Sequence, residues 1–200
     1  ILNNTKFNNL YVPSAAHDAG TSIGSSLYLY NYILGKKRKK SINTASFGYK
    51  SSHDEILEVL IKNKIKYELL NDENLFNEVT DMLIEGAVVG WFQGRAEFGP
   101  RALGNRSILV DPRRNDVKDL LNKKIKRRES FRPFAPSILK EKVFDYFNVN
   151  AEVPFMEMVL KINPEKTHEI PAVTHVDGTG RLQSVDHISS PRYHKLISRF

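Results

Sequence analysis

The pattern of apolar and polar residues near the start of the chain has the period of an amphipathic helix. Apolar side chains recur at spacings of four, three and four residues, at Ile23, Leu27, Tyr30 and Leu34. Gly35 follows, and glycine is favoured just past a helix end because it reaches the left-handed conformation without a steric cost. The sequence therefore predicts a first helix that ends at about Gly35.

Further along, helical and extended periods alternate. Ser52 and Glu55 have the spacing of a capping box ahead of an apolar run, which predicts a helix start. The apolar run 87–92 is short and bounded by glycines, which is typical of a buried strand. The other expected helices cover 74–85, roughly 115–127 and 143–147, and the other expected strands lie near 65–70, 105–110 and 155–162.

Near the end of the chain, turn-forming residues separate two apolar segments. The sequence Asp-Gly-Thr-Gly at 177–180 lies between 172–176 and 181–185, which predicts a β-hairpin. The mixture of helices and strands predicts an α/β (α+β) fold with at least one antiparallel strand pair.

Basic residues gather in two places. The five consecutive basic residues 36–40 are typical of a solvated linker, and we expect a boundary there between domains at 1–40 and 41–200. Residues 91–140 hold 13 Lys and Arg against 5 Asp and Glu, an excess that covers the whole net charge of +7. Such a concentrated cationic surface attracts phosphates, nucleic acid or anionic lipid.

The composition excludes some classes of protein. The chain has no cysteine, so disulfides and thiolate metal sites are excluded and a reducing cytoplasm is compatible. It has no run of eighteen apolar residues, so no membrane partner is expected. The first residue is Ile1 rather than Met, and the sequence stops at Phe200 after a helical pattern, so we expect part of a longer protein.

Residues 93–114 place arginines among glycines and prolines, directly after the predicted strand 87–92. Guanidinium groups match phosphate oxygens with paired donors, and glycines let backbone amides approach the same oxygens. We therefore predict an anion-binding loop, stiffened by Pro100. The alternative is a solvated surface loop whose arginines pair with carboxylates, of which Glu97 is close in sequence.

Other polar positions have a structural alternative. Arg132 lies between aromatic residues and prolines, which favours an immobile cation, and Arg181 follows a glycine turn. His175 precedes that turn, although a lone histidine is more often structural than catalytic. Asp18 could cap a helix, bind a metal or contact a nucleotide, and capping is the default. The basic residues 123–128 end a predicted helix, where cations suit the helix dipole.

Several of these stretches resemble a known family. GWFQGRAEFGPRALGNRSILVDPRR, KRRESFRPFAPSIL and IPAVTHVDGTGRLQSV closely resemble the C-terminal domain of O-carbamoyltransferases of the nodulation and antibiotic-tailoring type. LYVPSAAHDAGTSIGSSLYLY resembles the last stretch of their N-terminal half, an actin-like ATPase fold also found in tRNA threonylcarbamoyl transferases. The resemblance implies a YrdC-like twisted mixed sheet with flanking helices in 41–200, preceded by the end of an actin-like domain in 1–40.

The resemblance also implies a reaction. The YrdC-like domain is expected to combine carbamoyl phosphate with ATP, giving carbamoyl-adenylate and pyrophosphate. The N-terminal half would then transfer the carbamoyl group to a hydroxyl of a sugar or antibiotic-like acceptor, so the rest of the same polypeptide is a partner. The implied cofactors are ATP, Mg²⁺, and iron or another divalent metal in the N-terminal half. The location is expected to be cytoplasmic, and the isolated fragment is expected to be inactive.

The family's functional positions can be placed on matching residues of this sequence. The anion-binding positions fall on Arg95, Arg101, Arg106, Ser107, Lys124, Arg132, His175 and Arg181. Among them, Arg101, Arg106 and His175 are expected to be catalytic, and the others to bind the nucleotide or the carbamoyl donor. Asp18 matches a metal-binding aspartate and Gly20 a nucleotide-side glycine. The family's metal-binding histidines are absent here, so residues outside this chain would complete that metal site.

Two rival functions remain open at the level of sequence. A pI of about 9.5 and a basic YrdC-like surface also fit a double-stranded RNA-binding module without carbamoyl transfer activity, although nucleic acid is not the expected partner. A third interpretation is a non-catalytic scaffold whose arginine loop docks the N-terminal half.

Overall fold

The computed structural model describes residues 5–8, 10–38 and 42–200, and within them it combines α-helices with short strands. The helices are α1 Gly20–Tyr28, α2 His53–Lys62, α3 Asp72–Ile84, α4 Val117–Leu120, α5 Val143–Phe147 and α6 Pro191–Arg199. The strands are β1 Val89–Phe92, β2 Arg106–Leu109, β3 Ser137–Leu139, β4 Leu160–Lys161, β5 Thr179–Gly180 and β6 Gln183–Val185. α1 and α4 continue as π-helical turns over Leu29–Ile33 and Leu121–Ile125. The predicted mixed α/β class is confirmed.

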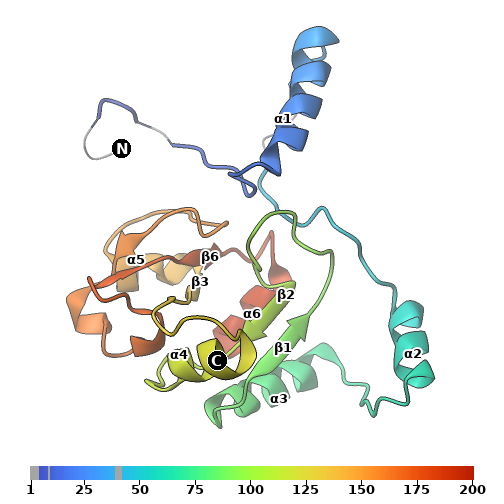
Figure 1. Ribbon diagram of the computed structural model, residues 1–200, viewed down its shortest axis with the longest axis vertical. Helices are drawn as coiled ribbons and strands as arrows, with labels where there is room; N and C mark the ends of the chain where they lie inside the picture. The colour runs from blue at the N-terminus through green and yellow to red at the C-terminus, as the bar shows by residue number, and fades with distance from the viewer. Residues whose placement is uncertain (1–4, 9, 39–41) are drawn as a thin grey trace.

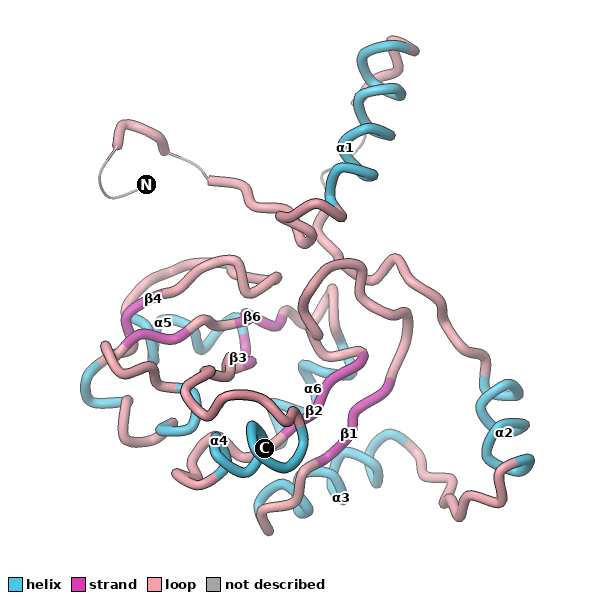
Figure 2. Tube along the Cα trace, viewed as in Figure 1, coloured by secondary structure: helices cyan, strands magenta, loops and turns pink. Residues whose placement is uncertain are grey.

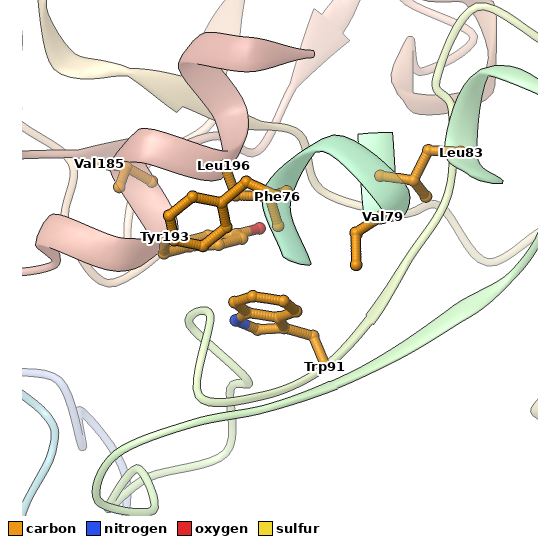
Figure 3. Packing of buried hydrophobic residues seen from close by; sticks show 7 residues of the cluster. All are labelled: Phe76, Val79, Leu83, Trp91, Val185, Tyr193 and Leu196. Atoms are coloured by element: carbon orange, nitrogen blue, oxygen red, sulfur yellow. The ribbon is translucent and has the colours of Figure 1, made fainter. Parts of the chain in front are cut away.

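The main core lies where α3 and α6 pack against β1. Phe76, Val79 and Leu83 recur at helical spacing along α3, and all three side chains are buried. They meet Trp91 of β1 and Tyr193 of α6, as Figure 3 shows. The ring centroids of Phe76 and Trp91 are 6.4 Å apart. This core fixes the position of α6, which lines the candidate site, and of β1, which pairs with the β2 strand that also lines it.

β1 and β2 form an antiparallel pair, which confirms the expected antiparallel pairing. Val89 lies opposite Leu109, and Phe92 lies opposite Arg106. The arginine-rich loop 93–105 therefore connects the two strands at one end of the pair. The predicted strands 87–92 and 105–110 correspond to β1 and β2 within two residues at each end.

The predicted hairpin 172–176 with 181–185 is wrong. Its turn forms, since Gly178 has φ +75° and its N–H donates to the carbonyl of His175 at 3.0 Å. The first arm instead forms a single turn of 3-10 helix over Pro171–Val173, β5 within the predicted turn pairs antiparallel with β4, and β6 in the second arm pairs parallel with β3. The reason is burial, because Ala172 of the first arm packs in the cluster with α4, whereas Leu182 of the second arm packs in the cluster around α5.

Two predicted strands also differ from the structure. The segment 65–70 forms no strand, because no other strand lies beside it, and Tyr67 and Leu69 are exposed. The predicted strand 155–162 shrinks to β4, because Met156 has φ +57° and interrupts the extended run. In the part of the chain that is described, the strands form three separate two-stranded sheets.

The described residues before α3 form an extended arm. The first helix ends as predicted. Leu34 is its C-cap residue, and Gly35 follows with φ +59°. α2 begins with the predicted capping box, since the Glu55 N–H donates to Ser52 Oγ at 3.2 Å and the Ser52 N–H donates to Glu55 Oε2 at 2.7 Å. Neither α1 nor α2 has a buried residue, and both stand away from the rest of the molecule (Figure 1, Figure 2).

The proposed linker at 36–40 falls partly outside the described residues, because these end at 38 and resume at 42. Among the residues that the structure describes, no helix combines the length and the apolar character needed to span a bilayer.

Candidate functional site

A cavity of about 330 Å³ lies between β2, the segment 133–137 and α6. Four cationic side chains line it, namely Arg101, Lys126, Arg128 and Arg181. They come from the arginine-rich loop, from the segment after α4 and from the connection between β5 and β6, which are far apart in the sequence. Among the described residues that line this cationic cavity, none is acidic. Such a cavity attracts anions, because no carboxylate neutralises its positive charge.

The cations in the cavity affect one another. Burial lowers the pKa of the Arg181 guanidinium below its ordinary value, and the positive charges of Arg101 and Arg128 lower it further. The Nε atom of Arg181 is buried and has no hydrogen-bond partner among the described residues. An unpaired buried donor is costly, so a bound anion would remove an existing penalty as well as form new bonds.

Glu97 does not neutralise Arg101. Its Oε1 atom accepts hydrogen bonds from the backbone amides of Leu103, at 2.7 Å, and Asn105, at 2.8 Å. Among the described residues it forms no ion pair with a cationic side chain. The carboxylate therefore shapes the loop through its backbone and pairs with no loop arginine. At the end of the segment 93–114, by contrast, Arg113 pairs with Asp111 and Arg114 pairs with Asp116, as the alternative expected.

Two arginines of the same loop point back onto backbone carbonyls. The Nη1 atom of Arg106 donates to the carbonyl of Gln93 at 2.6 Å, and its guanidinium carbon lies 3.5 Å from the centroid of the Phe92 ring. The Nη1 atom of Arg95 donates to the carbonyl of Gly48 at 3.2 Å. Neither side chain lines the cationic cavity, whereas Ser107 does, and its Oγ accepts from the Gly104 N–H at 2.9 Å.

The second motif contributes through a residue that was not predicted from the sequence. Arg128 Nε donates to Asn122 Oδ1 at 2.7 Å, and the Arg128 guanidinium carbon lies 4.7 Å from the centroid of the Phe134 ring. Asn122 is fully buried, and its Nδ2 donates to the carbonyls of Ser130 and Arg132. A buried amide with all these partners holds the loop in one conformation and fixes Arg128 at the cavity.

The two predicted residues near Arg128 lie elsewhere. Arg132 is exposed, and its Nε atom is 2.8 Å from Glu129 Oε2. Lys124 is exposed and does not line the cavity. Sequence reasoning assigned the basic run 123–128 to the solvated end of a helix, and so missed Lys126 and Arg128. The available signal was Asn122, a polar amide next to the buried Leu121 in an otherwise basic segment.

The third motif holds a chain of hydrogen bonds. Thr179 Oγ1 donates to Asp177 Oδ1 at 2.7 Å and lies 2.9 Å from His175 Nδ1. The Thr179 hydroxyl, followed by its backbone amide, lowers the pKa of Asp177. His175 Nε2 is buried and has no hydrogen-bond partner among the described residues. His175 therefore has one fixed ring nitrogen and one free ring nitrogen.

Two hydroxyl groups lie at the boundary with a neighbouring cavity. Burial raises the pKa of Tyr193 to about 12, so its hydroxyl stays neutral and donates to Ser137 Oγ at 2.8 Å. A second cavity of about 510 Å³ shares Ser137 and Phe200 with the cationic one, and apolar side chains such as Ile138 and Phe147 contribute to its lining. The small cationic cavity thus adjoins a larger and more apolar space.

A family model for the carbamoyltransferase C-terminus matches residues 80–200, and this range includes every residue that lines the cationic cavity. This chain belongs to the carbamoyltransferase family. The family resemblance stated from the motifs is thereby confirmed.

Individual relatives cover much or all of this carbamoyltransferase chain. Nodulation protein NolO of Bradyrhizobium diazoefficiens is 37% identical over 198 residues, which cover 97% of this chain and 36% of that protein. An uncharacterised protein of Synechocystis is 40% identical over 227 residues, covering 100% of this chain and 37% of that protein. The 3'-hydroxymethylcephem-O-carbamoyltransferase of Amycolatopsis lactamdurans is 41% identical over 124 residues, covering 62% of this chain and 23% of that protein. The chain thus spans little more than a third of the length of NolO and of the Synechocystis protein.

The predicted residues of the N-terminal stretch lie outside the cationic cavity. The expectation that Asp18 caps α1 is wrong, since Ala19 is the cap and makes no side-chain bond. The Asp18 carbonyl instead accepts from Thr21 Oγ1 at 2.6 Å. Gly20 is required locally, because a Cβ there would lie 2.2 Å from the carbonyl oxygen of Ala15. Among the described residues, no group of three or more His, Cys, Asp or Glu could hold a metal ion.

Proposed function

We propose that this chain is part of an O-carbamoyltransferase whose cationic cavity binds carbamoyl phosphate and ATP and forms carbamoyl-adenylate. Residues 41–200 are then its YrdC-like domain, and residues 1–40 are the end of an actin-like ATPase-fold domain. The observation that supports this most is the convergence of Arg101, Arg128 and Arg181 in a cavity whose described lining has no carboxylate.

The electrostatics suit a reaction between two polyanions. Carbamoyl phosphate and the triphosphate of ATP repel each other, so fixed cations between them lower the cost of bringing them together. Arg128 is held by Asn122, which limits the side-chain ordering that binding would require. The adjoining apolar cavity offers room for the less polar part of a nucleotide.

The proposed formation of carbamoyl-adenylate takes two steps. Water cleaves the phosphorus–oxygen bond of carbamoyl phosphate, giving carbamate and inorganic phosphate. A carbamate oxygen then attacks the α-phosphorus of ATP, the bond to the β-phosphate oxygen breaks, and pyrophosphate leaves. Both steps need charge neutralisation and alignment rather than a protein nucleophile. In the proposed site, Arg101 and Arg181 carry the positive charge, Ser107 offers a hydroxyl, and Arg95 and Arg106 shape the loop.

The acceptor and the metal belong to the part of the protein that this chain does not span. The name of the Amycolatopsis relative says that its carbamoyl acceptor is a hydroxymethyl group. For this chain we propose that the acceptor is a hydroxyl group of a sugar or antibiotic-like molecule. Mg²⁺ would accompany ATP. Asp18 is an exposed single carboxylate without neighbouring ligands among the described residues, so this chain alone does not fit the implied divalent metal.

Binding is tested first by thermal unfolding. A ligand that binds the folded state raises the melting temperature, so millimolar carbamoyl phosphate or ATP should raise that of the full-length protein. Indifference to both ligands in a well-folded sample would contradict the proposal.

Catalysis is tested by carbamoyl-phosphate-dependent exchange of pyrophosphate into ATP by the full-length protein. Removing a cation that stabilises the transition state costs about 100-fold or more, so Arg101→Ala should lower the exchange rate by that factor. Lys123→Ala is the matched control, because Lys123 is an exposed cation paired with Asp119 at 3.2 Å. An unchanged rate in Arg101→Ala would remove this arginine from the mechanism.

The rival functions predict other outcomes. An RNA-binding module would bind duplex RNA with a steep salt dependence that ATP does not change. The burial of Trp91 in the main core removes one candidate for base stacking. A docking scaffold would lose domain association in Arg106→Ala while retaining small-anion binding.

A further inference from the structure

A buried glutamine lies where three segments of the cationic cavity wall meet. Gln183 of β6 is 4% exposed and does not itself line the cavity. Its Nε2 atom donates to the carbonyl of Leu103 in the arginine-rich loop at 2.9 Å, and its Oε1 atom accepts from Ser137 Oγ at 3.2 Å. Its backbone N–H donates to the carbonyl of Pro136 at 2.8 Å. One residue thus links β6 both to the arginine-rich loop and to the segment 133–137.

The partners of Gln183 fix the orientation of its side-chain amide. A carbonyl oxygen only accepts hydrogen bonds, so the NH₂ group of Gln183 faces Leu103 and the amide oxygen faces Ser137. The hydroxyl proton of Ser137 then points to Gln183, and Ser137 Oγ accepts from the Tyr193 hydroxyl at 2.8 Å. Exchanging the two ends of the amide would break two of these three bonds, so the side chain has one orientation.

The loop stretch that receives this bond carries Arg101. Among the described residues, the other hydrogen bonds to 101–104 come from the loop itself and from the strand after it. Glu97 accepts from the Leu103 N–H, and Ser107 accepts from the Gly104 N–H. The bond from Gln183 instead ties this stretch to a part of the chain that is 80 residues away.

A tie is needed here because Arg101 and Arg181 repel each other. Both line the cavity, and the charge of Arg101 adds to the effect of burial in lowering the pKa of Arg181. Like charges favour separation of the segments that carry them, and no carboxylate in the described lining offsets them. Each arginine lies two residues before one end of the Gln183–Leu103 bond, so this bond opposes the separation close to both charges.

We propose that Gln183 is a positioning residue, which holds Arg101 beside Arg181 so that both contact one bound anion. Ser137 and Tyr193 keep its amide in the orientation that this role requires. The inference deepens the proposed function and rests on it, because it assumes that the cationic cavity binds phosphoryl anions.

Arg128 provides a control within the same cavity. Its Nε atom donates to Asn122, which holds it independently of Gln183. If Gln183 acts by position, its loss lowers the contribution of Arg101 to anion binding and leaves that of Arg128 unchanged. If Gln183 only stabilises the fold, its loss affects the two arginines alike.

The test is a pair of double-mutant cycles on the full-length protein, with the dissociation constant of inorganic pyrophosphate measured by titration calorimetry. Arg101→Ala and Arg128→Ala should each weaken binding by the wild type about tenfold or more. Gln183→Met keeps the approximate size of the side chain, removes the Nε2 donor and should weaken binding by about threefold or more. In that background Arg101→Ala should cost about threefold or less, whereas Arg128→Ala should still cost about tenfold.

Gln183→Asn is the second variant, should Gln183→Met fail to fold, and the same results are expected for it. It keeps an amide but is one methylene shorter, so it cannot bond to Leu103 and Ser137 at once. Thermal unfolding checks that each variant is folded.

The outcomes separate this inference from the proposed function. An undiminished cost of Arg101→Ala in a folded Gln183 variant, or an equal loss for both arginines, would overturn the positioning role and leave the proposed function standing. Failure of the wild type to bind pyrophosphate would contradict the proposed function, and this inference with it.

Discussion

The N-terminal arm and the body of this carbamoyltransferase chain both contain apolar helices, but they bury them differently. In α3, Phe76 is 1% exposed and Leu83 is 5% exposed. In α1 and its π-helical turn, Leu27 is 45% exposed and Tyr32 is 74% exposed. The periodicity is helical in both, so an apolar stripe indicates which face is available for packing and not what covers it.

The relatives are longer than this chain, which is consistent with the exposure of the apolar side chains of α1. The chain spans 37% of the Synechocystis relative and 36% of NolO. α1 stands apart from the body in Figure 1, whereas α3 lies along it. Contiguous exposed apolar surface is typical of interaction sites. We therefore propose that the rest of the polypeptide covers α1.

The largest expected contrast is in the free energy of unfolding when an apolar side chain is truncated in each region. Phe76→Ala should lower the free energy of unfolding by about 3–5 kcal/mol, because it leaves a cavity beside Trp91. Leu27→Ala should change it by less than about 0.5 kcal/mol, because its side chain is already half in water. Urea unfolding of this 200-residue chain measures both values, and similar losses would show that the arm is packed in solution.

Alanine substitutions at two glycines compare how tightly the backbone is packed in the body and in the arm. Gly104 has φ +102°, and a Cβ there would lie within 2.3 Å of the Tyr193 ring, so Gly104→Ala should cost about 2–4 kcal/mol. Gly35 has φ +59° with no atom within 4 Å of a Cβ, so Gly35→Ala should cost about 1 kcal/mol. Thermal unfolding compares the two variants, and equal effects would mean that the loop at Gly104 repacks freely.

The smallest expected effect is electrostatic and lies within the body. Hydrogen bonds from Lys195 and then Arg199 hold the pKa of Glu73 below its ordinary value of 4.5. A lowered folded pKa means that the stabilisation is fully present above 4.5 and is lost as the pH falls through the folded value. Glu73→Gln should therefore be less stable than the wild type at neutral pH, by the small margin of a surface pair.

A pH series of melting temperatures tests this prediction. The gap between the wild type and Glu73→Gln should close in acid below the ordinary carboxyl range. A gap that is independent of pH would show that charge does not link α3 to α6.

Local signals in the sequence predicted local structure well. The capping box at Ser52, the helix end at Gly35 and the two strands that flank the arginine-rich loop all form, because each depends on neighbouring residues. The hairpin prediction failed because Ala172 of one arm and Leu182 of the other pack in different clusters, and that choice depends on distant parts of the chain.

The candidate site was predictable only in part for the same reason. Arg101, Ser107 and Arg181 lie at one cavity, as the motifs suggested. The backbone partners of Arg106 and the ion pair of Arg132 depend on tertiary contacts that no spacing reveals. Arg128 was assigned to a solvated run because the role of Asn122 becomes visible only when the loop carbonyls are placed around it.

The central claim is that Arg101, Arg128 and Arg181 form one anion site, and calorimetric titration of the full-length protein with carbamoyl phosphate tests it most directly. Arg128→Ala should weaken binding by about tenfold or more, since hydrogen bonds to charged groups contribute about 1.5–3 kcal/mol. Arg127→Ala removes the adjacent exposed cation, which does not line the cavity, and should change affinity by less than about twofold. Equal affinities in the wild type and Arg128→Ala would contradict the claim.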